Sequence, residues 1–146
     1  MEPGGSPPPV RTESGTGWVL VCDDTASIRL LMRINLELAG FEVLEAGDGQ
    51  EALDVLATQE TPPELACVDW NMPVMDGLTF INHVRKHPQW RATTLMMVTT
   101  ESEQGQIVRA LAAGAHEYLI KPFTGEAMVE KLDLLGLLPA PTGDQT

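Results

Sequence analysis

The stretch Trp18-Val-Leu-Val-Cys-Asp-Asp24 decides the fold class of this 146-residue chain. Its five consecutive apolar residues, 18–22, predict a strand that is buried on both faces, as strands of parallel sheets are. Two carboxylates follow where this strand ends. The stretch 65–68 is apolar in the same way and also ends at an acid, Asp69. Two buried strands that each end at a carboxylate indicate an α/β sheet with polar chemistry along one edge.

Strand-like and helix-like stretches alternate along the rest of the chain. The predicted strands are residues 18–22, 41–46, 65–68, 95–98 and 117–120. The predicted helices are residues 26–39, 48–58, 78–86, 103–113 and 125–137. Five strands alternating with five helices predict a single open, doubly wound parallel sheet, joined by right-handed crossovers.

Apolar spacing predicts the packing faces of the first and last helices. In residues 26–39 the apolar positions at helical spacing are Ile28, Leu31, Ile34, Leu38 and Ala39, and Gly40 follows at a C-cap position. In residues 125–137 they are Met128, Leu132 and Leu135. We expect these side chains to face the core.

Composition narrows the class of protein. Hydrophobic residues make up 43% of the chain, enough for the core of one domain, and 21 acids against 9 bases give a net charge of -12. Such a charge repels nucleic acid, so we expect no direct nucleic-acid partner. No apolar run approaches the roughly 20 residues of a membrane span, and the start of the chain does not resemble a signal peptide. We therefore expect a cytoplasmic protein without a membrane partner.

The ends of the chain differ in composition from its middle. Residues 1–16 and 139–146 are rich in Pro and Gly and read as flexible tails, which leaves residues 17–138 as the single domain. Cys22 and Cys67 lie in apolar runs without a CxxC pair or a Cys/His cluster, so we expect buried free thiols rather than a zinc site.

Polar residues gather where the predicted strands end. They are Asp23, Asp24, Asp69, Thr99, Thr100 and Lys121. The carboxyl ends of parallel strands meet at one edge of the sheet, so these side chains should lie close together. Three neighbouring carboxylates repel one another unless a cation compensates them. Their hard oxygen ligands predict a site for Mg²⁺, or for Mn²⁺ in its place.

The same residues suggest the chemistry. The chain has no GxxxxGK[ST] phosphate loop and no visible Ser/His/Asp arrangement, so a nucleotide or an acyl substrate is not favoured. A carboxylate can itself attack phosphorus and form an aspartyl phosphate. Phosphoryl transfer requires neutralisation of the equatorial oxygens, which a metal ion, Lys121 and the Thr99 hydroxyl could supply to Asp69.

Four stretches contain these polar residues in order along the chain: Val21-Cys-Asp-Asp24, Asp69-Trp-Asn-Met-Pro-Val-Met-Asp-Gly77, Met97-Val-Thr-Thr-Glu101 and Gly114-Ala-His-Glu-Tyr-Leu-Ile-Lys-Pro-Phe-Thr124. Together they resemble one known family, the receiver domains of bacterial two-component response regulators, and most of all its stand-alone chemotaxis members. The resemblance covers residues 18–138. It implies a flavodoxin-like sheet with strand order 2-1-3-4-5.

The resemblance also implies a role for each matching residue. Asp69 is the phosphoryl acceptor, and it ligates Mg²⁺ together with Asp24 and the backbone carbonyl of Asn71, while Asp23 assists. Lys121 and Thr99 contact the phosphoryl group, and Thr99 with Tyr118 forms the switch. The residues implied to shape the surrounding loops, or to tune dephosphorylation, are Trp70, Met72, Pro73, Asp76, Gly77, Glu101 and Pro122. The bond between Lys121 and Pro122 is expected to be cis.

The resemblance implies a phosphoprotein of a signalling relay rather than a turnover enzyme. A sensor histidine kinase or a histidine phosphotransfer protein would phosphorylate it, and a downstream protein would bind the face made by the fourth helix, fifth strand and fifth helix. No effector domain is expected after residue 138, so the output is a protein contact, such as a flagellar switch, a phosphotransfer protein or a kinase.

Three other functions compete with this one. A haloacid-dehalogenase-type phosphatase also uses an aspartate nucleophile, but it needs an acid two residues further on. Here Thr25 and Ala26 stand two residues after Asp23 and Asp24, which disfavours that class. A receiver-fold scaffold that is never phosphorylated, or an intermediate in a phosphorelay, remains the alternative.

Overall fold

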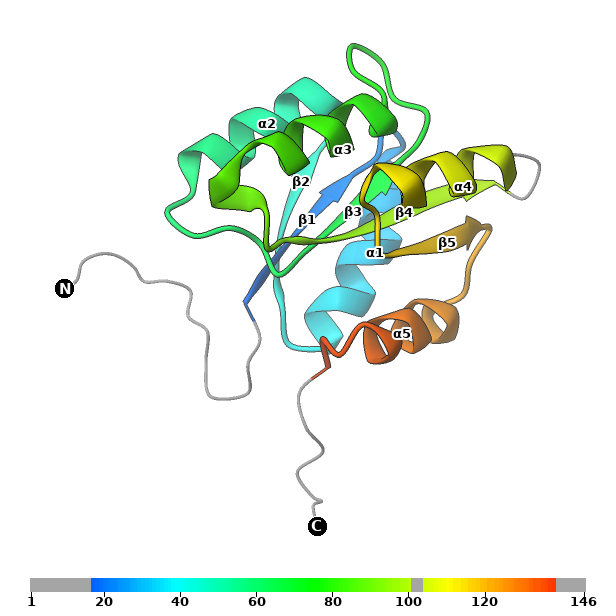
Figure 1. Cartoon of the computed structure of the whole chain (residues 1–146). Coiled ribbons are helices and arrows are strands. Elements are labelled where there is room, and N and C mark those ends of the chain that lie inside the picture. The colour runs from blue at the N-terminus through cyan, green and yellow to red at the C-terminus, as the bar shows by residue number, and fades with distance from the viewer. Residues whose placement is uncertain (1–16, 101–103, 139–146) are drawn as a thin grey trace, which may run out of the picture.

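The computed structural model describes residues 17–100 and 104–138 (Figure 1). The predicted tails, residues 1–16 and 139–146, lie outside the described residues. In the described part of the chain, no helix is long and apolar enough to cross a membrane.

Five strands form one parallel sheet. They are β1 (Trp18–Cys22), β2 (Glu42–Ala46), β3 (Leu65–Asp69), β4 (Thr94–Thr100) and β5 (Glu117–Lys121). The spatial order is β2-β1-β3-β4-β5, and every neighbouring pair is parallel. The predicted α/β class and the strand order 2-1-3-4-5 are both confirmed.

Five helices cover the two faces of this sheet. They are α1 (Ala26–Leu38), α2 (Gly49–Thr58), α3 (Gly77–Lys86), α4 (Gln104–Ala113) and α5 (Gly125–Leu134). Figure 1 shows α2, α3 and α4 on one face and α1 with α5 on the other. Each face has its own buried cluster, and alternate residues of the central strands belong to one cluster or the other. Burial on both faces explains why these strands are continuously apolar.

Several predicted element ends are corrected by the structure. Thr99 and Thr100 were expected just after the fourth strand but lie inside β4, because β4 stays paired with β5 as far as Lys121. The last helix ends at Leu134 rather than at residue 137, since the chain turns through Gly136 with a positive φ of 74°. A short 3-10 helix, Pro88–Trp90, was not predicted.

The packing face of α1 also differs from the predicted one. Met32 and Leu36 are fully buried, whereas Ile34 and Leu38 are 47% and 81% exposed. Ile28 and Ala39 do pack against the core, as expected. The helix carries aliphatic residues on all sides, so spacing alone does not select the buried side. Contact with the sheet selects it.

His116 makes the stability of the fold depend on pH. Its Nδ1 accepts a hydrogen bond from the backbone N–H of Leu95 at 3.1 Å, which requires that nitrogen to be unprotonated. Burial and the nearby charge of Arg85 lower the pKa of His116 below its ordinary 6.5. The unfolded chain therefore takes up a proton at higher pH than the folded chain does. The stability that neutral His116 contributes to the fold is fully present above pH 6.5. It is lost as the pH falls towards the lower pKa of His116 in the folded chain.

We expect urea unfolding between about pH 7.5 and pH 5.5 to reveal this loss. Because the ring is exposed and solvent screens its charge, the His116 contribution should be a few tenths of a kcal/mol. The variant His116→Asn, whose side-chain oxygen can still accept the Leu95 hydrogen bond, should lose less stability than the wild type as the pH falls through this range. His83→Asn on α3 is the matched control and should keep the wild-type profile. Equal profiles for the wild type and His116→Asn would contradict the assignment.

Candidate functional site

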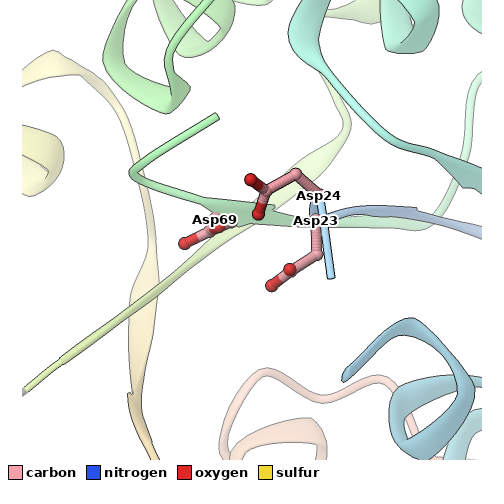
Figure 2. A group of neighbouring side chains, drawn as sticks. All are labelled: Asp23, Asp24 and Asp69. Atoms are coloured by element: carbon pink, nitrogen blue, oxygen red, sulfur yellow. The ribbon is translucent and has the colours of Figure 1, made fainter. Parts of the chain in front are cut away.

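Three carboxylates converge at the carboxyl ends of β1 and β3, which are neighbours in the sheet. One carboxylate oxygen from each of Asp23, Asp24 and Asp69 lies within 4.8 Å of the other two. Figure 2 shows the three side chains reaching from the two strand ends toward a common region. Asp23 and Asp69 are buried, and Asp24 is exposed. The structure thus brings together the three acids that the sequence singled out.

The chain holds Asp23 in place through its backbone and one oxygen of its side chain. The backbone N–H of Asp23 donates to the carbonyl of Ala46 at 3.1 Å, and Oδ1 accepts from the N–H of Thr25 at 2.8 Å. Arg29 donates to the carbonyl oxygen of Asp23 at 2.6 Å and to Glu45 at 2.8 Å. The turn after β1 is therefore tied to both α1 and β2.

Arg29 was missed in the sequence analysis. A cation so near the start of a helix opposes the helix dipole, and this is the one local signal that the residue has a partner. The partners themselves, Glu45 on β2 and the backbone of Asp23, could only be found in the folded chain.

Lys121 reaches the acids from β5. The register partner of Lys121 on β4 is Thr100. The Lys121 side chain therefore crosses β4 to reach the ends of β1 and β3. Its Nζ lies 2.9 Å from Oδ2 of Asp23 and 3.2 Å from Oδ1 of Asp69. Burial alone would lower the pKa of Lys121, but contact with the two carboxylates holds it above its usual value. The Lys121–Pro122 bond is cis, as the resemblance implied.

The acids retain excess negative charge despite Lys121. Burial and the charge of Asp23 raise the pKa of Asp69 to about 6, against the opposing effects of Lys121 and a backbone hydrogen bond from Asn71. Oδ2 of Asp23 is buried and lies 2.9 Å from Nζ of Lys121, an ammonium that it shares with Asp69. Three crowded carboxylates whose charge one ammonium does not balance offer hard oxygens that fit a divalent cation such as Mg²⁺.

The loop after Asp69 turns tightly into α3. The N–H of Gly77 donates to the carbonyl of Trp70 at 2.9 Å, and the N–H of Met75 donates to the carbonyl of Pro73 at 2.6 Å. Val74, which lies between Pro73 and Met75, has a positive φ of 68° and is 82% exposed. A β-branched residue in this conformation is strained, so the surrounding contacts must hold the loop. Met72 is partly buried against the core cluster on the face of the sheet that α2, α3 and α4 cover.

Trp70, which follows Asp69 at the end of β3, connects that strand to α4. The indole is buried, and the guanidinium of Arg109 lies 5.5 Å from a ring centroid, within the range of a cation–π contact. Arg109 was not predicted, because nothing in the local sequence relates it to Trp70.

The remaining predicted residues are spread along the same edge. Thr99 is buried at the end of β4, one residue beyond Val98, the register partner of Asp69. Tyr118 is half-buried on β5, two strands from Asp69. Glu101 lies outside the described residues. No structural observation assigns a role to Thr99 or Tyr118, so these remain predictions.

Comparison with known proteins identifies the class to which this fold and site belong. The family described as the response regulator receiver domain matches residues 19–133. The chain belongs to this family, whose members are signalling proteins.

The similar proteins carry chemotaxis names. A chemotaxis protein CheY homolog of Campylobacter jejuni is 39% identical over 120 residues, which are 81% of this chain and 92% of that protein. Chemotaxis protein CheY1 of Helicobacter pylori is 37% identical over 119 residues, 80% of this chain and 94% of that one. The solved structure of the chemotaxis response regulator CheY4 of Vibrio cholerae superposes with a TM-score of 0.74 at 37% identity, covering 80% and 96% of the two chains.

Proposed function

We propose that this chain is a single-domain response regulator whose Asp69 accepts a phosphoryl group and thereby changes which protein it binds. The observation that carries the proposal is the grouping of Asp69 with Asp23 and Asp24, with the ammonium of Lys121 3.2 Å from the Asp69 carboxylate. A carboxylate nucleophile, an acidic cluster that fits a metal ion and a nearby fixed cation are the parts that phosphoryl transfer to an aspartate needs.

The reaction is a displacement at phosphorus. An oxygen of Asp69 forms a bond to the phosphorus of a phosphohistidine while the P–N bond breaks, and its electron pair stays on the imidazole. Lys121 holds positive charge beside the attacking carboxylate and then beside the phosphoryl oxygens. Bound Mg²⁺, which Asp23, Asp24, Asp69 and the carbonyl of Asn71 would hold, neutralises further charge on those oxygens.

The donor is a protein with a phosphorylated histidine, either a sensor kinase or a phosphotransfer protein. The chain transfers the group only to itself and loses it again by hydrolysis, so it is not a turnover enzyme. The chemotaxis names of the relatives support a role in chemotaxis or motility signalling.

Phosphorylation acts as a switch. It adds about -1.5 to -2 charges at the end of β3. The Thr99 hydroxyl moves to the new phosphoryl oxygens, which frees inward space for Tyr118, and the face made of α4, β5 and α5 binds its partner differently. The partner must prefer one of the two states for the signal to pass on.

Acetyl phosphate labelling followed by intact mass measurement tests the proposal. We expect the wild type to gain one phosphoryl group with Mg²⁺ and none with EDTA. Asp69→Asn should gain none under either condition, since an amide oxygen cannot serve as the nucleophile. Asp48→Asn changes the half-buried N-cap aspartate of α2, which is not a member of the acidic group, and the amide oxygen can still accept the capping hydrogen bond from Glu51. It is the matched control and should label like the wild type. Failure of the wild type to label with Mg²⁺ would instead favour the unphosphorylated scaffold.

A further inference from the structure

Tyr118 lies on the edge strand of the sheet. It is the only tyrosine in the chain, and it lies on β5, the edge strand next to β4. Its backbone is in register with Met97, and its side chain packs against the cluster that includes Ala110 of α4. Because β5 is the edge strand of the described sheet, no further strand of that sheet covers the outer side of the ring.

Lys131 of α5 covers it. Its Nζ lies 4.4 Å from the centroid of the Tyr118 ring, well within the range of a cation–π contact. The buried residues of α5, Met128 and Leu132, belong to the cluster on the opposite face of the sheet. Figure 1 shows α4 and α5 on the two sides of β5. Lys131 therefore reaches around the edge strand from the α5 side to a ring on the α4 side.

Glu117 fixes the ammonium at this position. Its Oε1 accepts from Lys131 Nζ at 3.0 Å and from the backbone N–H of Tyr118 at 2.9 Å. The Lys131 and Glu117 side chains are only 23% and 21% exposed. One carboxylate oxygen thus joins the cation to the backbone of the residue whose ring it covers.

We propose that Lys131 is a positioning residue that holds Tyr118 in its resting place and so sets how readily the acceptor site is activated. This inference rests on the proposed function, in which the ring of Tyr118 moves inward when Asp69 is phosphorylated. A ring that moves inward leaves the ammonium of Lys131 behind. The contact then belongs to the resting state alone, and a contact present in one state only shifts the balance between the two.

The size of the effect follows from the strength of the contact. Losing a cation–π contact at a partly exposed site changes an equilibrium roughly two- to five-fold. Linkage requires that loss of a resting-state contact tightens the binding of any ligand that prefers the active state by that same factor. Beryllofluoride, which mimics the phosphoryl group on Asp69 in the presence of Mg²⁺, is such a ligand.

The experiment uses 3-fluorotyrosine in the full chain, which places a single ¹⁹F resonance at Tyr118. Beryllofluoride is titrated with Mg²⁺ into the wild type, Lys131→Gln, Lys131→Arg and Lys86→Gln. For Lys131→Gln we expect the unliganded resonance to move toward the liganded position. We also expect the apparent dissociation constant to fall roughly two- to five-fold. Removing a positive charge would by itself weaken binding of an anion, so charge alone cannot explain tighter binding.

The other two variants separate positioning from charge and from folding. Lys131→Arg should behave as the wild type, because a guanidinium keeps the cation–π contact. Lys86→Gln removes the same charge from an exposed position on α3 and should not tighten binding. Equal affinities of Lys131→Gln and the wild type, or equal tightening by Gln and Arg at position 131, would overturn the inference.

Failure of the proposed function would look different. If the wild-type resonance did not respond to beryllofluoride, the proposed switch itself would be wrong. If it responded and Lys131→Gln bound no more tightly, only the role of Lys131 would be refuted.

Discussion

Replacing Lys121 with Met should lower the free energy of unfolding in EDTA by about 3–5 kcal/mol, the usual cost of removing one partner from a buried ion pair. The Lys121 ammonium is the cation that contacts both Asp23, which is fully buried, and Asp69. Without it the two carboxylates face each other uncompensated. Added Mg²⁺ should restore part of the loss, since a cation among the acids replaces the missing charge. Urea unfolding followed by tryptophan fluorescence measures both effects.

The same variant should acquire a phosphoryl group from acetyl phosphate about 100-fold more slowly, as expected when one stabilising charge is lost from a transition state. Lys86→Met is the matched control, because Lys86 is exposed on α3 and remote from the acids. It should leave both stability and labelling near the wild-type values. An unfolding midpoint of Lys121→Met equal to that of the wild type in EDTA would show that Lys121 does not offset the repulsion.

Replacing Gly77 with Ala should cost about 2–3 kcal/mol of stability, as overpacking of a tight site does. A Cβ at this position would lie 2.5 Å from the carbonyl oxygen of Asp69 and 3.0 Å from the Cα of Trp70. Both are backbone atoms, so no side chain can turn away, and the end of β3 or the start of α3 must shift. Labelling of Asp69 should slow as well, because Asp69 lies on the displaced segment. Denaturant unfolding and intact mass measure the two results.

Gly105→Ala is the matched control for this substitution. Gly105 lies in α4, and a Cβ there would meet no atom within 4 Å. Alanine in a helix should stabilise this variant by about 0.5–1 kcal/mol. The two substitutions are chemically identical and should have opposite signs. If Gly77→Ala also stabilised the protein, the close approach of α3 to β3 would not be a constraint on this loop.

The order and type of the strands and helices follow from local sequence patterns. Long apolar runs such as 18–22 and 65–68 predict buried strands, and Asp23, Asp24 and Asp69 follow from where those runs stop. These patterns can be recognised within each segment. In a parallel sheet the carboxyl ends of all strands lie at the same edge, so acids that follow the strands come together there. For this reason the acidic group was predicted correctly before any contact was known.

Which surfaces of these elements meet depends on contacts that form in the folded chain. The buried side of α1 is the one with Met32 and Leu36 rather than Ile34 and Leu38, because contact with the sheet selects one side of a helix that carries aliphatic residues on every side. Lys121 reaches Asp69 across β4, and Lys131 reaches Tyr118 around the edge of β5. Such contacts join residues far apart in the chain or on different elements, and periodicity within one element carries no information about them.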